Sequence, residues 1–308
     1  MAIAMQPSPG TRPLLALVIR LGAIAGLATM SALIKLAAER GIHVLEIMFW
    51  RQFVTLPILL GWLALTSGLS SLRTARPGTH LLRGLYGTIG MVLNFGAVIL
   101  LPLAEATVLN FTAPIWATIL AMVLLKEHVG VWRWSAVLLG FVGILVIAQP
   151  GGGHIPLYGA LVALGGAFMI ALISIQIADL SRTESPLRIV FYFALFSTPV
   201  TALALPFVGS AHDAQGWLLL LAIGIAGSIG QLLLTAALRF GSVASVIVMD
   251  YSALFWATLY GWLIFATLPP TSTWFGAPLV MAAGLVIAWR EHRLSRLRAR
   301  ARSVAEGT

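Results

Sequence analysis

Apolar segments of about 20 residues recur along the whole chain, separated by short polar or Gly- and Pro-rich breaks. A helix of that length crosses the hydrocarbon of a bilayer and satisfies its own backbone polar groups there. We predict ten such helices over approximately residues 14–37, 43–66, 82–101, 104–125, 132–149, 157–179, 188–208, 215–238, 242–266 and 273–290. The predicted fold class is therefore an all-α integral membrane protein with ten transmembrane helices.

The composition agrees with a lipid environment. Only 9% of the 308 residues are charged and 59% are apolar, whereas a soluble domain has about 25% charged residues. The chain has no cysteine, which excludes disulfides, thiolate metal sites and cysteine nucleophiles. The segment from Met1 to Arg12 lacks a small-residue cleavage site, so we expect no removable leader.

Positive charge is distributed unevenly over the predicted loops. With both termini inside, 15 of the 19 basic residues lie in cytoplasmic segments, including six arginines from Arg290 to Arg302. The positive-inside rule therefore predicts a multi-pass protein of the bacterial inner (plasma) membrane with both termini cytoplasmic. The basic tail accounts for much of the net charge of +9 and favours contact with anionic membrane lipids over nucleic acid. The sequence leaves open whether the chain forms a homodimer.

An internal repeat relates the two halves of the chain. An offset of 140 residues aligns Gly84, Gly87 and Gly90 with Gly224, Gly227 and Gly230, and it aligns residues 110–118 with residues 250–258. Pro57 and Pro199 suggest an offset of 142 in the earlier helices. We expect repeat 1 over 13–149, repeat 2 over 157–290 and a basic cytoplasmic tail over 291–308. Each repeat has five spans, an odd number, so the two five-helix repeats must be inverted, an arrangement typical of alternating-access transporters.

Several motifs resemble the drug/metabolite transporter superfamily, in its ten-helix branch with two EamA domains. The first copy has Glu46-Ile-Met-Phe-Trp-Arg51, Leu82-Arg83-Gly84, Pro102-Leu-Ala-Glu-Ala-Thr107, Phe111-Thr-Ala-Pro114, Lys126-Glu127 and Gly140-Phe-Val-Gly143. The second copy resembles a subgroup with an Asp250-Tyr251 pair and a Trp256-Ala257 pair in the ninth helix. Thr267 stands where the family usually has a glutamate matching Glu127. The resemblance implies transport of a small metabolite similar to S-adenosylmethionine, riboflavin or an amino acid.

Two charged residues fall inside predicted spans and are candidates for substrate binding. Arg51 lies about eight residues into the second span, where a charge costs at least about 2.5 kcal/mol. It either binds an anionic group of the substrate or an internal carboxylate, or it anchors the fold. Asp250 lies inside the ninth span, and its repeat mate is the neutral Asn110. It either pairs with a cationic group of the substrate, takes up a proton, or bonds to a neighbouring helix.

Aromatic and uncharged polar side chains complete the candidate site. Aromatic side chains that line a pocket bind flat or cationic substrates by stacking and cation–π contacts; the alternative is packing or lipid contact. The aromatic candidates are Trp50, Tyr86, Phe111, Trp116, Tyr251, Trp256 and Tyr260, and the polar candidates are Asn94, Asn110, Gln231 and Thr235. Ordinary hydrogen bonding between helices is the alternative for the polar group.

Other conspicuous residues are interpreted as structural. Glu105 is expected to cap the fourth helix, and Arg20 is expected to extend to the cytoplasmic surface. The two glycine triplets are expected to allow close packing of helices rather than phosphate binding, because they lack a strand-turn-helix context.

The predicted function is secondary transport by alternating access, not catalysis. The sequence has no His-Glu-x-x-His motif, no Gly-x-Ser-x-Gly motif and no histidine pair with metal-ligand spacing. We therefore expect no catalytic residue, no metal and no cofactor. Uptake of a metabolite and export of amino acids or toxic compounds both stay open, as do proton coupling, exchange and facilitated diffusion.

Overall fold

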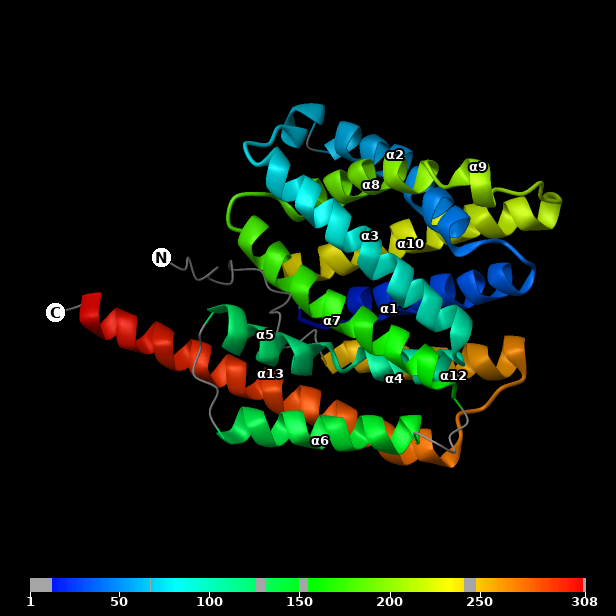
Figure 1. The fold of residues 1–308 in the computed structure, drawn as a ribbon. Coiled ribbons are helices and arrows are strands. Elements are labelled where there is room, and N and C mark those ends of the chain that lie inside the picture. Colours follow the sequence, from blue (N-terminus) through cyan, green and yellow to red (C-terminus); the bar gives the residue numbers. More distant parts are fainter. Residues whose placement is uncertain (1–12, 67, 126–130, 150–154, 241–247, 307–308) are drawn as a thin grey trace.

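A computed structural model describes residues 13–66, 68–125, 131–149, 155–240 and 248–306 (Figure 1). Within these ranges the chain is helical, with seven helices long and apolar enough to cross a membrane and two shorter apolar helices. The elements are α1 (Pro13–Glu39), α2 (Val44–Thr66), η1 (Leu69–Leu72), α3 (Pro77–Leu100), α4 (Leu103–Asn110), α5 (Ala113–Leu125), α6 (Val131–Ala148), α7 (Leu157–Leu180), α8 (Pro186–Ala202), α9 (Leu205–Val208), α10 (Ala214–Phe240), η2 (Val248–Tyr251), α12 (Ser252–Phe265) and α13 (Thr271–Glu306).

The contacts between helices have the symmetry of an inverted repeat. Helix α1 packs on α10, and the equivalent pair α7 and α3 packs in the same way; α2 with α10 matches α8 with α3. Likewise α1 with α12 matches α7 with α5. In addition, α2 packs on α8 and α6 packs on α13, and each of these contacts joins two equivalent helices. Figure 1 shows α1 and α7 crossing the molecule in opposite directions. The protein is therefore an all-α membrane bundle of ten spans built from two inverted five-helix repeats.

Helix α3 begins earlier than the sequence predicted. It starts at Pro77, which occupies the first helical turn, where proline is favoured because its missing N–H needs no partner there. The predicted start was residue 82. Arg83 therefore lies almost two turns inside the helix rather than at its cytoplasmic end, and it is only 8% exposed.

The predicted fourth helix is broken in two. Helix α4 ends at Asn110 and α5 begins at Ala113. Pro114 has no N–H to donate to a preceding turn, and the Thr112 hydroxyl instead bonds to the Leu109 carbonyl at 2.7 Å. In the second repeat the equivalent region is the 3-10 turn η2 followed by α12, so both copies interrupt the regular α-helix at the same place. Residues 242–247 of the predicted ninth helix lie outside the described ranges.

The remaining differences lie near the ends of the spans. The predicted helix 188–208 is divided into α8 and the short α9. The predicted tail is the continuation of α13, which stays helical to Glu306.

Glycine allows the last spans of the two repeats to pack closely. A Cβ atom on Gly276 of α13 would lie 2.4 Å from Ile147 Cγ1 and 2.8 Å from the carbonyl oxygen of Gly143 on α6. A backbone oxygen cannot move aside cheaply, so only glycine fits at this crossing. Gly26 of α1 faces Gly230 of α10 in the same manner, with its Cβ position 3.4 Å from the Gly230 Cα atom.

We predict that Gly276→Ala lowers the free energy of unfolding by about 1–3 kcal/mol, the usual cost of overpacking. Gly61→Ala on α2 is the matched control, because a Cβ atom there would meet nothing within 4 Å. Thermal unfolding in detergent, followed by intrinsic fluorescence, measures both variants. Equal melting temperatures for the two would contradict the proposed close approach of α6 and α13.

Candidate functional site

Arg51 lies in the centre of the bundle, where helices of both repeats meet. It belongs to α2, is 9% exposed, and its Nη1 atom donates to Gln52 Oε1 at 2.6 Å and to Met91 Sδ at 3.4 Å. Its Nε atom has no hydrogen-bond partner. Among the described residues no carboxylate forms an ion pair with this guanidinium.

Arg83 of α3 is a second buried cation in the same region. Its guanidinium lies over the Phe193 ring of α8, with 4.4 Å between the guanidinium carbon and the ring centroid, and neither Nε nor Nη1 has a hydrogen-bond partner. The predicted span begins at residue 82, which places Arg83 at its cytoplasmic end. Pro77, a frequent first residue of a helix, is the signal that would have placed Arg83 further inside the span.

Asp250 forms an ion pair with Arg20 of α1, so the expectation that Arg20 reaches the cytoplasmic surface is wrong. Arg20 Nε and Nη2 donate to the two carboxylate oxygens at 2.7 Å each. The side chain of Arg20 is 10% exposed and that of Asp250 is 35% exposed. Such a bidentate pair satisfies both charges inside the bundle, which is cheaper than leaving either alone. Both residues are at a similar depth from the same end of their predicted spans, a signal that would have paired them.

Aromatic side chains surround the segment that carries Asp250. The Tyr251 ring meets Phe111 edge-on, with 4.9 Å between centroids, so residues beside the two helix interruptions touch each other. The Tyr251 hydroxyl approaches Gly284 of α13, where a Cβ atom would lie 2.3 Å from it. On α12, Trp256 stacks on Tyr260 at 6.0 Å, and the Tyr260 hydroxyl bonds to Thr29 of α1 at 2.7 Å.

Other candidates lie away from this group. Trp50 packs edge-on against Trp217 near the first turns of α2 and α10, at 5.0 Å. Trp116 contacts Phe168 of α7 and Phe141 of α6 at 5.8 and 6.0 Å, and its buried Nε1 has no hydrogen-bond partner. Tyr86 is half-buried on α3.

The polar candidates differ in their surroundings. Asn94 Nδ2 donates to the Gly90 carbonyl at 2.8 Å and to the Gly166 carbonyl of α7 at 3.4 Å, so it joins two helices. Asn110 has a buried Oδ1 atom without a partner. Gln231 is half-buried in α10, and the side chain of Thr235 lies outside the described part of the structure.

Lys35 and Glu105 both make polar contacts inside the bundle. Lys35 donates to the carbonyls of Val98, Ile99 and Leu101 at 3.2, 3.3 and 2.9 Å. It thereby stabilises the C-terminal end of α3. Glu105, the expected cap, is fully buried in the first turn of α4 and accepts from the Thr273 hydroxyl of α13 at 3.1 Å.

Polar contacts join the two repeats at both ends of the bundle. At one end, buried Glu184, between α7 and α8, accepts from the Thr74 hydroxyl at 2.5 Å and from Arg188. Arg188 also donates to the Ser71 carbonyl at 2.6 Å. At the other end, His212 Nε2 lies 2.7 Å from Glu46 Oε1. These contacts hold both ends together in this conformation.

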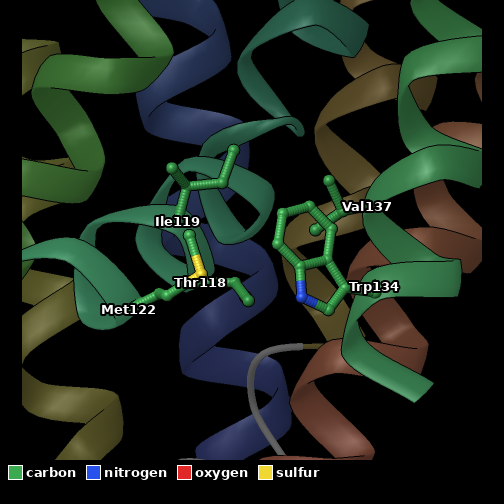
Figure 2. Close-up of a pocket in the computed structure, with 5 residues that line it drawn as sticks. All are labelled: Thr118, Ile119, Met122, Trp134 and Val137. Atoms are coloured by element: carbon green, nitrogen blue, oxygen red, sulfur yellow. The ribbon is translucent and has the colours of Figure 1, made fainter. Parts of the chain in front are cut away.

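Two surface hollows are distant from the central arginines. The first, shown in Figure 2, lies between α5 and α6 and is lined by Thr118, Ile119, Met122, Trp134 and Val137. It contains no charged side chain and none of the predicted site residues. The second, of about 350 Å³, includes Arg40, His212 and Asp213 at the end of the bundle where α10 begins. Among the described residues there is no group of three or more His, Asp or Glu side chains that could hold a metal ion.

Comparison with known proteins assigns the chain to a family. The model of the EamA-like transporter family matches residues 14–149 and again 157–289. The chain belongs to the EamA-like transporter family. Its relatives are transporters rather than enzymes, and the two matched regions each contain five of the ten spans.

Curated relatives of this EamA transporter match it over most of both chains. A riboflavin transporter of Vibrio cholerae is 32% identical over 79% of this chain and 82% of its own. An S-adenosylmethionine uptake transporter of Rickettsia felis is 28% identical, with 82% and 85% covered. The pseudopaline exporter CntI of Pseudomonas aeruginosa is 31% identical, with 84% and 90% covered. A solved crystal structure with a TM-score of 0.60 and 22% identity covers 91% of this chain and 98% of its own, and it supports the fold alone.

Glu184 gives this EamA transporter an acid-sensitive contact outside the spans. Burial alone would raise the pKa of Glu184, but hydrogen bonds from Thr74 and Arg188 and the charge of Arg188 hold that pKa below its ordinary value. A carboxyl group whose pKa is lower in the folded state contributes stability above its unfolded pKa, and this contribution is lost as the pH falls through the lowered value.

We predict that the melting temperature of the wild type falls as the pH decreases below about 4.3, the ordinary glutamate pKa, and that Glu184→Gln removes part of this dependence. Unfolding in detergent between pH 7 and pH 3 measures it. Asp179→Asn, which removes an exposed partner of Arg76, is the matched control. An unchanged acid dependence in Glu184→Gln would exclude this contact as its source.

Proposed function

We propose that this protein is a secondary transporter that moves a small organic metabolite across the bacterial inner membrane by alternating access. The observation that supports this most is the exchange symmetry of the contacts between repeats. Because the largest contacts between the two repeats have equivalents when the repeats are exchanged, the inverted repeats can adopt two conformations of similar energy, each open to one side.

The interrupted helices support a substrate path between the repeats. Helix α4 ends and α5 begins beside Asn110, and η2 precedes α12 at Asp250. In transporters, discontinuous helices at matching positions of the two repeats commonly surround the substrate and coupling-ion sites. The aromatic contact between Phe111 and Tyr251 lies between these two interruptions.

Asp250 is the residue best placed to couple transport to a proton or to a cationic group. Its carboxylate is partly exposed and pairs with Arg20 across the interface between the repeats. The repeat mate Asn110 carries no charge, so the ion pair is not a requirement of the repeated fold. A proton or a cationic substrate group that neutralises Asp250 would release Arg20 and loosen the contact between α1 and η2.

The relatives suggest the class of substrate. Riboflavin and S-adenosylmethionine both have a flat heterocycle, and the group formed by Phe111, Tyr251, Trp256 and Tyr260 offers faces and edges for such a ring. Riboflavin is the first compound to test, followed by S-adenosylmethionine and amino-acid-like metabolites. Export is the second candidate, because the exporter CntI is 31% identical to this chain.

Charge supports an orientation with both termini in the cytoplasm. Helix α1 begins and α13 ends on the same side of the bundle (Figure 1). Helices α3 and α8 also begin on this side (Figure 1), and Arg76 and Arg188 lie next to these helix starts in the sequence. Arg293 of the final helix lies just beyond the last span on this side and would contact anionic lipid headgroups.

We expect saturable counterflow of one of these compounds in proteoliposomes that contain the purified protein. Labelled riboflavin, S-adenosylmethionine and a pool of amino acids are tested with and without an imposed proton gradient. Trans-stimulation by the unlabelled compound identifies a carrier rather than a channel. Absence of counterflow for every compound in both directions would contradict the substrate class.

We also predict that Asp250→Asn lowers the transport rate by about tenfold, equivalent to about 1.4 kcal/mol, and removes its pH dependence. The swapped variant Arg20→Asp with Asp250→Arg keeps an ion pair and is expected to regain stability without regaining transport. Asp179→Asn, which loses an exposed ion pair, is the control with normal transport. Normal transport by the swapped variant would mean that the pair is only structural.

A further inference from the structure

The most unusual electrostatic feature of the bundle is its central pair of arginines. Arg51 and Arg83 are each more than nine-tenths buried, and both adjoin the same turn of α8. Arg83 lies over Phe193, and Arg51 is linked through Gln52 to Ser197, whose hydroxyl donates to the Phe193 carbonyl. Among the described residues neither has a carboxylate partner, and three of their guanidinium nitrogens have no hydrogen-bond partner. Two like charges that are buried together are unfavourable unless an anion joins them.

Among the side chains that the structure describes, the other buried or partly buried arginines are paired. Arg20 binds Asp250, and Arg188 binds Glu184. These pairs show the usual way in which a structural arginine is accommodated, with its counter-charge supplied by the same chain. The central pair departs from that pattern, so its counter-charge is expected to come from elsewhere.

The glycine triplets make room for both guanidinium groups. A Cβ atom on Gly87 would lie 2.2 Å from Arg83 Nη1, and one on Gly227 would lie 3.3 Å from Arg51 Nε. Gly87 and Gly227 are repeat mates, so the same position in each triplet adjoins one arginine. The triplets were expected to allow close packing of helices, and these distances show that they also leave space for the guanidinium groups.

The pair breaks the symmetry of the repeat. At an offset of 142, the mate of Arg51 is Phe193, the ring on which Arg83 stacks. At an offset of 140, the mate of Arg83 is Ile223. The first repeat therefore contributes both cations and the second contributes apolar groups, although the backbone packing is equivalent. Closing the symmetric fold does not require these charges.

Neighbouring polar groups hold Arg51 in place without neutralising it. Gln52 Oε1 accepts from Arg51, while its Nε2 donates to Ser197 Oγ of α8 at 2.5 Å. This chain of hydrogen bonds links α2 to α8 and leaves Arg51 Nε unpaired. A preorganised donor with an unused N–H group is the arrangement that anion recognition needs.

We propose that Arg51 and Arg83 form an anion subsite that binds a carboxylate or phosphate group of the transported molecule. The favoured substrates are then organic anions and zwitterions such as S-adenosylmethionine and amino acids, rather than riboflavin, which is uncharged. The anionic group would lie between α2, α3, α8 and α10. This inference deepens the proposed transport function and rests on it, but the subsite can be tested by binding alone.

The first test uses the purified full-length protein with inorganic phosphate or acetate as the probe. At constant ionic strength, set with chloride, either probe is expected to raise the melting temperature of the wild type saturably, because it binds the folded state only. Arg51→Gln and Arg83→Gln are expected to lose this response, and Arg83→Lys to retain part of it. A wild type that responds to neither probe, or glutamine variants that respond like the wild type, would overturn the subsite.

The second test separates an anion site from a structural role. In the absence of a probe, Arg83→Gln is expected to leave the melting temperature unchanged or to raise it, since it removes repulsion from Arg51. Arg188→Gln is the matched control and is expected to lower the melting temperature, because Glu184 loses its partner. If Arg83→Gln were as destabilising as Arg188→Gln, Arg83 would be a structural anchor.

The third test uses pairs of competitors that differ in one anionic group. They are riboflavin 5′-phosphate with riboflavin, and L-tryptophan with L-tryptophanamide, each tested against whichever compound shows counterflow. The anionic member is expected to compete about tenfold better, and Arg51→Gln is expected to abolish the difference. Equal competition by both members of each pair would refute the subsite while leaving the transport function intact. Conversely, probe-dependent stabilisation without any counterflow would refute the transport function alone.

Discussion

The cost of a charge in a bundle surrounded by lipid organises the interior of this protein. Taking an ion out of water costs several kcal/mol even after relaxation, so each buried charge must find a partner or serve a purpose. The charge of Lys35 binds the carbonyl groups at the end of α3. The charge of Arg20 pairs with Asp250 and joins α1 to η2. The central arginines have no such partner among the described residues, and this contrast directs attention to them more strongly than their burial alone.

The scaffold and the polar groups follow different rules. Backbone packing is nearly equivalent in the two repeats, down to the interrupted helices and the glycines at helix crossings. The charged side chains are not equivalent. Asp250 occupies the position that the neutral Asn110 has in the first repeat, and Arg51 occupies the position that Phe193 has in the second. A symmetric backbone provides two conformations, whereas an asymmetric set of charges can give those conformations different affinities for a ligand or a proton.

The sequence predicted the architecture because its signals are periodic and long. Twenty-residue apolar runs and a constant offset between repeats define ten spans and their inversion with little dependence on any single residue. The exact ends of the spans depend on local chemistry instead. Helix α3 begins at Pro77, five residues before the predicted start, and this difference places Arg83 inside the span rather than at its end. Arg20 and Asp250 are 230 residues apart in the chain, so their similar depth in two different spans, and no local pattern, is the signal that relates them.

The helical continuation of α13 changes the reach of its arginines. Helix α13 runs to Glu306, whereas its apolar part ends at Trp289. With a rise of about 1.5 Å per residue, Arg302 lies about 20 Å beyond that point along the axis. Charges interact through physiological salt over only about 8 Å. As a rigid rod, the helix would keep Arg293 near the headgroups and hold its last turns out of range of the lipid, so those turns form a charged projection into the aqueous phase.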